Sequence, residues 1–381
     1  SSAAQMCIRD RFSPMIDVSR DPRWGRIMES FGEDPYVNGV MGEAMVDGYQ
    51  QKNDEGIAAC LKHFAGYGAV NAGREYNDVE ISQRTFLEQY VKPFRMALKA
   101  KPAMVMTAFN AIDRKPISGN KELLRDLLRD KEGFDGTVIS DWGSIGQLKE
   151  QGVAADMDEA ASQAIEAGVD IDMMSPAYMF RLEELVKNGQ IPESFIDESA
   201  FRVLMMKNQL GLFENPFAGI GKSGKLTQYN RTKAYQMASE SYVLLKNEKI
   251  LPLSQKQKVI WVGPYVTSKE FLSRWAIFGE HEPVETIEDI LQDKKINGVC
   301  IPGCRMLSEE ECRIWQVKPV DSDEEIDEQW LETINREDTV VCVLGEHESQ
   351  SGEAASRAFL TLPEEQQRLF EKIVKRTDNI V

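Results

Sequence analysis

Asp141 stands at the end of a short β-branched run and directly before an aromatic residue, in the stretch 137–142, Thr-Val-Ile-Ser-Asp-Trp. Such a run predicts a short strand, because β-branched residues favour strands and Gly133 and Gly136 precede it as breakers. A carboxylate at the carboxyl end of a strand that leads into a helix is where α/β barrels carry catalytic groups. Asp141 is therefore a candidate nucleophile. Taken alone, the same position favours a helix N-cap, a frequent role of aspartate.

A second group of carboxylates follows another predicted strand, in the loop 345–357, which offers Glu346, Glu348 and Glu353. Two carboxyl groups on facing loops are the equipment of glycoside hydrolysis. One attacks or stabilises the anomeric carbon, and the other protonates the leaving oxygen. On this hypothesis Asp141 is the nucleophile and one of the three glutamates is the acid.

Cationic and aromatic side chains accompany these carboxylates. Arg26, Lys62 and His63 can favour the ionised form of Asp141 and can hydrogen-bond sugar hydroxyls. Trp142 offers a flat face for a sugar ring. A purely structural alternative has about equal weight: Trp142 would be a core residue, and Arg26 and Lys62 would pair with nearby acids, namely Glu29, Glu33 or Asp34.

Strands and helices alternate through the first part of the chain. We expect strands over 12–18, 56–64, 103–108, 137–140 and 169–174, and helices over 36–49, 82–99, 123–128, 154–167, 178–187 and 192–210. Short, continuous apolar strands between helices indicate a parallel sheet buried on both faces. Because parallel strands point the same way, the polar clusters that follow them should converge on one face. Five strands are fewer than a closed eight-stranded barrel needs, and a missing N-terminal portion would supply the rest.

A Gly- and Pro-containing stretch without apolar periodicity, 213–224, marks a domain boundary. Beyond it the same alternation resumes and predicts a second α/β domain. We expect strands over 243–245, 259–262, 299–301 and 339–344, and helices over 233–242, 324–334 and 363–374.

The composition narrows the class of partner. A formal net charge of −17 disfavours nucleic acid and anionic membrane surfaces, and no apolar run approaches the length of a membrane span. The six cysteines form no CxxC pair and the three histidines are scattered, so we expect no metal site and no cofactor. The chain also looks like a fragment cut at both ends.

Ordered motifs extend along most of the chain. The blocks 17–26 (Asp-Val-Ser-Arg-Asp-Pro-Arg-Trp-Gly-Arg) and 29–36 (Glu-Ser-Phe-Gly-Glu-Asp-Pro-Tyr) resemble the signature of glycoside hydrolase family 3. Further blocks resemble that family in the same order: 62–64, Asn110, 133–136, 140–142, 166–170, 210–216, 244–247, 251–253 and 351–357. Each block by itself is weak evidence for the family, but the whole set in this order is specific to it.

This resemblance implies a fold and a domain organisation. A (β/α)8-type barrel, incomplete at its N-terminus, would occupy 12–215. A linker would follow over 216–231, and an α/β sandwich domain, also partial, would occupy 232–381. The family's first barrel strands carry an aspartate that grips the far sugar hydroxyls, and they are absent from this chain.

The resemblance also implies an activity: a retaining, exo-acting β-glycosidase of the β-glucosidase type that hydrolyses terminal, non-reducing β-linked sugars. Asp141 would form the covalent glycosyl-enzyme, and Glu353 would act first as acid and then as base. The matching substrate contacts are Arg26, Lys62, His63, Met106, Phe109, Trp142, Trp275 and, as a weaker candidate, Ser175. Many family members have Tyr in place of Phe109.

The loop 67–76 and the Glu353 block look most like the periplasmic bacterial β-glucosidases, which implies a periplasmic or extracellular location and a small-molecule or oligosaccharide substrate. Tyr67 stands where the N-acetylhexosaminidase branch has a second histidine, and this favours the two-carboxylate mechanism. The alternatives are a non-catalytic carbohydrate-binding relative and a β-xylosidase or N-acetylhexosaminidase specificity. The sequence leaves the oligomeric state open.

Overall fold

The computed structural model describes residues 10–50, 56–217, 228–254, 257–270, 275, 284–315 and 329–381. The chain divides into two compact units, Ser1–Ser223 and Gly224–Val381, here called unit 1 and unit 2. This division falls inside the predicted linker 216–231. The limits 12–215 and 232–381 for the two domains stay predictions.

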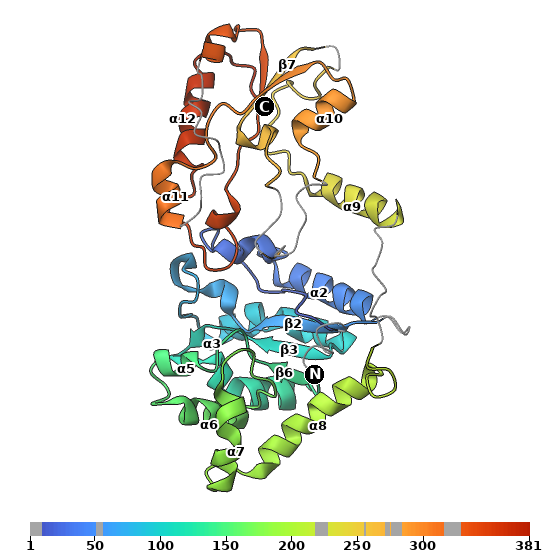
Figure 1. The fold of residues 1–381 in the computed structure, drawn as a ribbon, viewed down its shortest axis with the longest axis vertical. Helices are drawn as coiled ribbons and strands as arrows, with labels where there is room; N and C mark the ends of the chain where they lie inside the picture. Colours follow the sequence, from blue (N-terminus) through green and yellow to red (C-terminus); the bar gives the residue numbers. More distant parts are fainter. Residues whose placement is uncertain are drawn as a thin grey trace. The chain divides into compact units, whose positions relative to one another are not determined.

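Unit 1 is built on a parallel sheet, as the alternation of strands and helices predicted. Its strand order is β1 (Asp10–Arg11), β2 (Ala58–Phe64), β3 (Met104–Thr107) and β6 (Thr137–Ile139). Figure 1 shows β2, β3 and β6 side by side, with α2 next to β2 and α8 next to β6. A small antiparallel ribbon follows β3 and comprises β4 (Ala111–Ile112) and β5 (Lys115–Pro116).

Both faces of the sheet are buried, because alternate strand residues point to opposite sides. Leu61, Val105 and Val138 belong to the large core under the helices. Cys60 and Met106 belong to a smaller cluster on the other face. The predicted two-sided burial is therefore confirmed.

Two predicted strands are shorter than expected. The stretch 12–18 runs beside β2 but forms only an isolated bridge at Met15, because Pro14 has no N–H to donate to a ladder. The stretch 169–174 likewise contributes a single bridge, from Ile171 to Ile139. Next to that bridge, the carboxylate of Asp170 accepts the Val138 N–H at 2.8 Å.

The predicted helix 82–99 is divided into four segments: α3 (Gln83–Thr85), η4 (Phe86–Tyr90), α4 (Lys92–Ala97) and η5 (Leu98–Ala100). Pro93 lacks the N–H that a continuous helix needs, and a π-helical turn precedes it. The start is as predicted, since the Ser82 hydroxyl accepts the Thr85 N–H at 3.1 Å.

The predicted helices 36–49, 123–128, 154–167, 178–187 and 192–210 are present in order, with shifted bounds, and short helical segments that were not predicted lie before and between them. Together these are η1 (Gly25–Glu29), α2 (Pro35–Tyr49), η2 (Tyr67–Ala69), η3 (Asn71–Gly73), η6 (Ile117–Gly119), η7 (Glu122–Lys131), α5 (Gln147–Glu150), α6 (Met157–Ala167), α7 (Ala177–Lys187) and α8 (Glu193–Gln209). Asp34 caps α2 by accepting the Tyr36 N–H at 2.7 Å, and Pro35 fits the first helical position.

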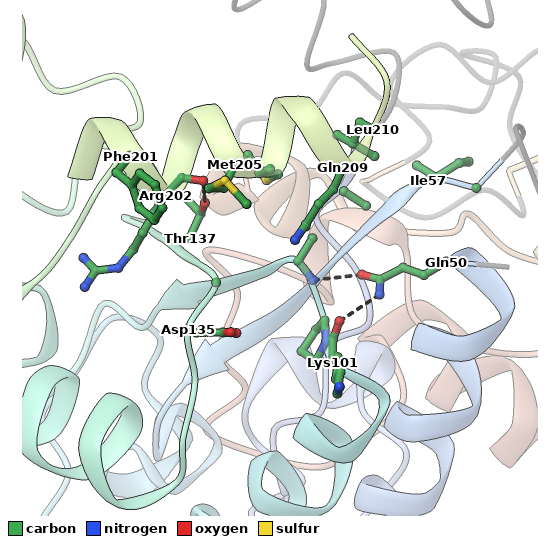
Figure 2. Close-up of a pocket in the computed structure, with 16 residues that line it drawn as sticks. Gln50, Ile57, Lys101, Asp135, Thr137, Phe201, Arg202, Met205, Gln209 and Leu210 are labelled. Atoms are coloured by element: carbon green, nitrogen blue, oxygen red, sulfur yellow. Dashed lines mark hydrogen bonds between the residues drawn. The ribbon is translucent and has the colours of Figure 1, made fainter. Parts of the chain in front are cut away.

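A cavity of about 720 Å³ lies at the amino-terminal ends of the strands, beside α8 (Figure 2). Ala58, Ala103 and Thr137 mark the strand starts that line it, and Met205 and Gln209 line it from α8. It is thus at the end of the sheet opposite to the carboxyl ends, where the candidate catalytic residues follow the strands.

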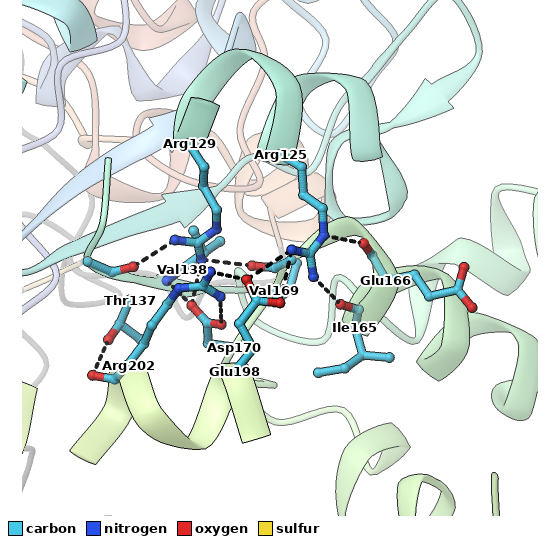
Figure 3. Close-up of polar contacts among 12 residues, drawn as sticks. Arg125, Arg129, Thr137, Val138, Ile165, Glu166, Val169, Asp170, Glu198 and Arg202 are labelled. Atoms are coloured by element: carbon cyan, nitrogen blue, oxygen red, sulfur yellow. Dashed lines mark hydrogen bonds and ion pairs between the residues drawn. The ribbon is translucent and has the colours of Figure 1, made fainter. Parts of the chain in front are cut away.

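A buried ion cluster fastens β6 to α8 and η7 (Figure 3). Asp170 is fully buried; Arg129 donates to its Oδ2 at 2.7 Å and Arg202 to its Oδ1 at 3.0 Å. Arg125 extends the cluster to Glu198 at 3.0 Å. The cluster fixes the backbone of the strand that ends near Asp141.

Unit 2 contains a second parallel sheet, of order β8 (Gly298–Ile301), β7 (Val259–Val262) and β9 (Thr339–Cys342). Its helical segments are α9 (Gln228–Ser241), η8 (Pro264–Val266), α10 (Ile287–Asp293), α11 (Glu309–Trp315), η9 (Gln329–Thr333), η10 (Glu348–Gln350) and α12 (Glu364–Ile373). Two core side chains come from β7 and α12, namely Val262 and Leu369.

Two predictions for unit 2 need correction. The stretch 243–245 was predicted as a strand, but it forms none and its side chains are exposed. Within the described part of the unit, no neighbouring strand pairs with it. The predicted helix 324–334 lies partly outside the described residues, and its described end is the 3-10 helix η9. In the described parts of both units, no helix is long and apolar enough to cross a membrane.

Candidate active site

Three polar side chains meet at the carboxyl ends of neighbouring strands in unit 1. Asp17 follows the extended stretch beside β2, His63 lies near the end of β2, and Asp141 follows β6. They are 2%, 1% and 7% exposed. The convergence that parallel strands predicted is therefore present in the structure.

Asp141 is held by its own loop and by β2. Its Oδ1 accepts the Trp142 N–H at 2.7 Å, and its Oδ2 lies 3.4 Å from Nε2 of His63. The next helix, α5, begins at Gln147 and has Gly146 at its N-cap position. The N-cap alternative for Asp141 is therefore wrong, and its carboxylate is positioned by the turn and by His63.

His63 is the central member of the group. Its Nδ1 lies 2.8 Å from Oδ2 of Asp17, and its backbone N–H donates to the same oxygen at 3.0 Å. Burial lowers the pKa of His63 well below its usual value, and Arg26 and Lys62 lower it further. Burial also raises the pKa of Asp17 to about 7, against the lowering effect of the hydrogen bond from the His63 backbone. A neutral imidazole thus lies between two buried carboxyl groups.

Arg26 is completely buried and forms a bidentate pair with Glu29, at 2.8 and 3.0 Å. Its guanidinium also lies over the Tyr67 ring, 5.6 Å from the centroid. The pairing that we considered as a structural alternative is present for Arg26, with Glu29 as its partner. Lys62 is half-buried on β2, next to His63.

Trp142 is 61% exposed, so the structural alternative, in which it is a core residue, is wrong. Its loop is tied to the segment that carries Ser175, because the Gly143 N–H donates to the Met173 carbonyl at 2.7 Å. The Ser175 hydroxyl itself donates to Asp172 within its own turn. The segment therefore lies beside Asp141, while the Ser175 hydroxyl has a local acceptor.

Two predicted lining residues are buried in unit 1. Met106 is 2% exposed and packs with Ile139, its register partner on β6. Phe109 is 4% exposed, and its ring meets those of Tyr67 and Tyr76 edge to face, at 5.9 and 5.0 Å between centroids. Phe109 thus joins the aromatic group next to His63, whereas Met106 lies among apolar side chains of the sheet.

The loop after β2 forms the aromatic wall of the site. The Tyr67 hydroxyl and the Trp24 indole both donate to Glu75, and the Tyr67 ring lies edge-on to His63 at 5.3 Å. A Cβ at Gly68 would lie 2.1 Å from the Val18 carbonyl oxygen, so only glycine allows this close approach.

Sequence reasoning missed two members of this group, Asp17 and Glu75. Asp17 had one usable signal: it lies at the end of the predicted strand 12–18, just as Asp141 lies at the end of its own strand. Glu75 had none, because its partners Trp24 and Tyr67 come from separate loops.

In unit 2, Glu353 is half-buried in the loop after β9, between residues with left-handed backbone: Gly352 has φ 86° and Ala354 has φ 63°. Glu346 pairs with Arg357 at 2.7 Å, and Glu348 is exposed. Trp275 is 51% exposed. Across the described residues of the two units, no group of three or more His, Cys, Asp or Glu side chains could hold a metal ion.

Comparisons with known proteins identify the family. Residues 1–206 match the Glycosyl hydrolase family 3 N terminal domain, and residues 242–381 match the Glycosyl hydrolase family 3 C-terminal domain. The chain belongs to glycosyl hydrolase family 3. The family resemblance seen in the ordered motifs is therefore confirmed.

Two relatives within this family differ in their named activity. The "Periplasmic beta-glucosidase" of Salmonella typhimurium is 34% identical over 94% of this chain and 50% of that protein. The "Putative beta-xylosidase" of Formosa agariphila is 41% identical over 67% of this chain and 35% of that protein. This family 3 chain thus spans half or less of the length of these relatives.

The fold is shared with solved family members. The β-glucosidase from Listeria innocua in complex with isofagomine matches 98% of this chain and 52% of that chain, with 39% identity and a TM-score of 0.84. A family 3 exo-beta-xylosidase in complex with a xylobiose aziridine probe matches 96% of this chain and 48% of that chain, with 27% identity and a TM-score of 0.79. These matches support the two-domain α/β fold of the family.

Proposed function

We propose that this chain is part of a retaining, exo-acting β-glycosidase of the β-glucosidase type, which hydrolyses terminal, non-reducing β-linked sugars. The observation that carries the proposal is the position of Asp141, a buried carboxylate at the carboxyl end of β6 with His63 Nε2 at 3.4 Å. Membership of family 3 supports the reaction type, and a relative named as a β-glucosidase supports the substrate class.

In the proposed reaction, an Asp141 carboxylate oxygen attacks the anomeric carbon while the bond from that carbon to the leaving oxygen breaks. Glu353 gives its proton to the leaving oxygen. A water molecule then attacks the anomeric carbon, Glu353 takes the water's proton, and the bond to Asp141 breaks. Sugar and enzyme are released with both carboxyl groups in their starting protonation states.

Substrate contacts are proposed for residues around this carboxylate. Lys62, His63 and the exposed ring of Trp142 are the best placed, since they lie on or next to the Asp17–His63–Asp141 group. The remaining proposed contacts are Arg26, Met106, Phe109, Ser175 and Trp275. Arg26 is already paired with Glu29 and lies over the Tyr67 ring. We therefore propose that it holds the Tyr67 ring in place in addition to contacting sugar hydroxyls.

The proposed architecture is that of the family: a (β/α)8-type barrel domain over 12–215, a linker over 216–231, and an α/β sandwich domain over 232–381. The four parallel strands of unit 1 and the three of unit 2 support it. We also propose a periplasmic or extracellular location, supported by the relative named as periplasmic.

A β-xylosidase is the second candidate function, because the 41% identical relative carries that name. An N-acetylhexosaminidase of the histidine-dependent type is less favoured, since Tyr67 donates its hydroxyl to Glu75 and is buried. A non-catalytic carbohydrate-binding relative is the remaining alternative.

The test is a panel of nitrophenyl glycosides applied to the complete protein, with its Asp141→Asn variant as the matched control. The panel contains the β-glucoside, β-xyloside, arabinoside and N-acetyl-β-glucosaminide. We expect the β-glucoside to be the best substrate and the variant to be inactive on all four. If the protein binds these glycosides but hydrolyses none of them, the proposal is contradicted and the non-catalytic alternative is favoured.

A further inference from the structure

We propose that Asp17 is a positioning residue that decides which ring nitrogen of His63 carries the proton, and so whether His63 donates a hydrogen bond to Asp141. Its consequence for catalysis rests on the proposed role of Asp141 as nucleophile. The assignment of the proton itself does not, because it follows from the contacts of three buried side chains.

The three groups form one line. Oδ2 of Asp17 lies 2.8 Å from Nδ1 of His63, and on the far side of the ring Nε2 lies 3.4 Å from Oδ2 of Asp141. The same Asp17 oxygen accepts the His63 backbone N–H at 3.0 Å. The ring is therefore fixed at its backbone and at Nδ1 by one carboxyl oxygen, and its only other polar atom points at Asp141.

Each gap in this line needs one proton to become a hydrogen bond. A neutral imidazole has one N–H, so it cannot donate across both gaps. If Asp17 is protonated, it donates to Nδ1, and the ring proton sits on Nε2 and faces Asp141. If Asp17 is ionised, it accepts from Nδ1–H, and the Nε2 lone pair then faces the Asp141 carboxylate. The protonation state of Asp17 thus selects the tautomer of His63.

The surroundings allow Asp17 to keep a proton near neutral pH. Burial raises its pKa to about 7; Arg26, Lys62 and the His63 N–H act in the opposite direction, and Glu29 adds to the rise. The same burial, with Arg26 and Lys62, disfavours an imidazolium at His63. The Tyr67 ring packs edge-on against the His63 ring, with 5.3 Å between the ring centroids. Because the two groups are in contact, they titrate as a pair.

A purely structural role for Asp17 is distinguishable, because the Asp17→Asn variant keeps an acceptor for the backbone. Its carbonyl oxygen can take the place of Oδ2 and accept both the backbone N–H and an Nδ1–H. Its amide nitrogen cannot take that place, since it would oppose the backbone N–H of His63. The variant should therefore fold with the ring in place and hold His63 as the Nδ1–H tautomer at every pH.

The direct test is magic-angle-spinning ¹⁵N NMR of the complete protein labelled only at histidine, with His63 identified by the loss of its signals in His63→Gln. We expect the Nε2–H tautomer at about pH 6 and the Nδ1–H tautomer at about pH 8.5. Asp17→Asn should show Nδ1–H at both values. Asp21→Asn, a matched change in the same segment whose carboxylate bonds Arg23, should behave like the parent protein.

A single tautomer of His63 at both pH values in the parent protein, or an imidazolium at about pH 6, would overturn the inference. This result does not depend on the variant folding. The kinetic companion is kcat/KM for a 2,4-dinitrophenyl glycoside, whose leaving group needs no proton. We expect it to fall about tenfold or more in Asp17→Asn at about pH 6 and to become independent of pH above that value.

The two readouts separate this inference from the proposed function. A tautomer change in a protein that hydrolyses no glycoside would support the Asp17 assignment and overturn the glycosidase proposal. Full activity of Asp17→Asn with an unchanged pH profile would overturn the positioning role, whatever substrate the enzyme prefers.

Discussion

Nε2 of His63 lies 3.4 Å from Oδ2 of Asp141, and the opposite nitrogen of the same ring lies 2.8 Å from Oδ2 of Asp17. His63 is thus the link between two buried carboxyl groups that come from different strand ends. His63 Nε2 faces one carboxylate oxygen of Asp141, while the other oxygen accepts the Trp142 N–H at 2.7 Å.

His63→Ala should lower kcat/KM for aryl glycosides by about tenfold to a hundredfold, because a hydrogen bond to a charged group contributes about 1.5–3 kcal/mol. The loss should appear mainly in kcat, since the carboxylate loses its orientation. Steady-state kinetics on the complete protein check this, with Glu88→Ala, a change in the exposed pair of Arg84 and Glu88, as the control. Equal losses in both variants would point to general destabilisation.

Asp17→Asn should change the pH dependence of stability. The pKa of Asp17 is raised to about 7 in the folded protein from 3.8, so its contribution is complete below about pH 4 and is lost as the pH rises through about 7. The amide of the variant does not titrate, so the variant does not lose this contribution as the pH rises. As the pH rises from about 4 to about 7, the free energy of unfolding of the variant should therefore increase relative to that of the parent, by up to about 4 kcal/mol.

Urea denaturation across that pH range measures the difference. The lowered pKa of His63 acts in the opposite sense, adding stability that disappears as the pH falls below its ordinary value of 6.5, and it is present in both proteins. A constant difference between variant and parent from about pH 4 to about pH 8 would show that Asp17 is ionised throughout.

Asp170→Ala should destabilise unit 1 by about 3–5 kcal/mol, because it removes the carboxylate that pairs with the buried Arg129, while Arg202 keeps Glu198 as a partner. The exposed pair of Arg84 and Glu88 provides the control, and Glu88→Ala should have little effect. Thermal unfolding of the three proteins checks the contrast. Similar melting temperatures would mean that the ion cluster does not hold β6 in place.

Glu353→Ala should lose most of its activity toward glycosides with poor leaving groups, because no acid protonates the leaving oxygen. With a 2,4-dinitrophenyl glycoside, whose leaving group needs no proton, azide should raise the rate of the variant by attacking the glycosyl-enzyme in place of an activated water. Glu346→Ala is the matched control, since the Glu346 carboxylate is already paired with Arg357 at 2.7 Å. If azide rescued Glu346→Ala or Glu348→Ala but not Glu353→Ala, the rescued position, and not Glu353, would be the acid/base.

Much of unit 1 was predictable because local and periodic signals agree there. Pro35 predicts the start of α2, and Ser82 predicts the start of α3. The alternation of strands and helices predicts a parallel sheet and the meeting of His63 with Asp141. These features depend on helix caps and on strand direction, which are written in short stretches of sequence.

Other features depend on partners that are distant in sequence. The stretch 243–245 has the composition of a strand, but a strand needs a neighbour, and its residues are exposed. Trp142 looks like a core residue by type, yet its loop directs it to solvent. Asp17 lies in a family motif but was not predicted as a site residue, because its contact with His63 forms only when 12–18 and β2 lie side by side.

We expect Asp141 to become covalently attached to the sugar during turnover. The most direct measurement is mass spectrometry of the complete protein after reaction with an activated 2-deoxy-2-fluoro-β-glucoside, followed by peptide mapping. We expect one fluoroglucosyl group on the peptide that contains Asp141 and none on the Asp141→Asn variant. A label on another carboxylate, or turnover of ordinary glucosides without any covalent adduct, would contradict the account.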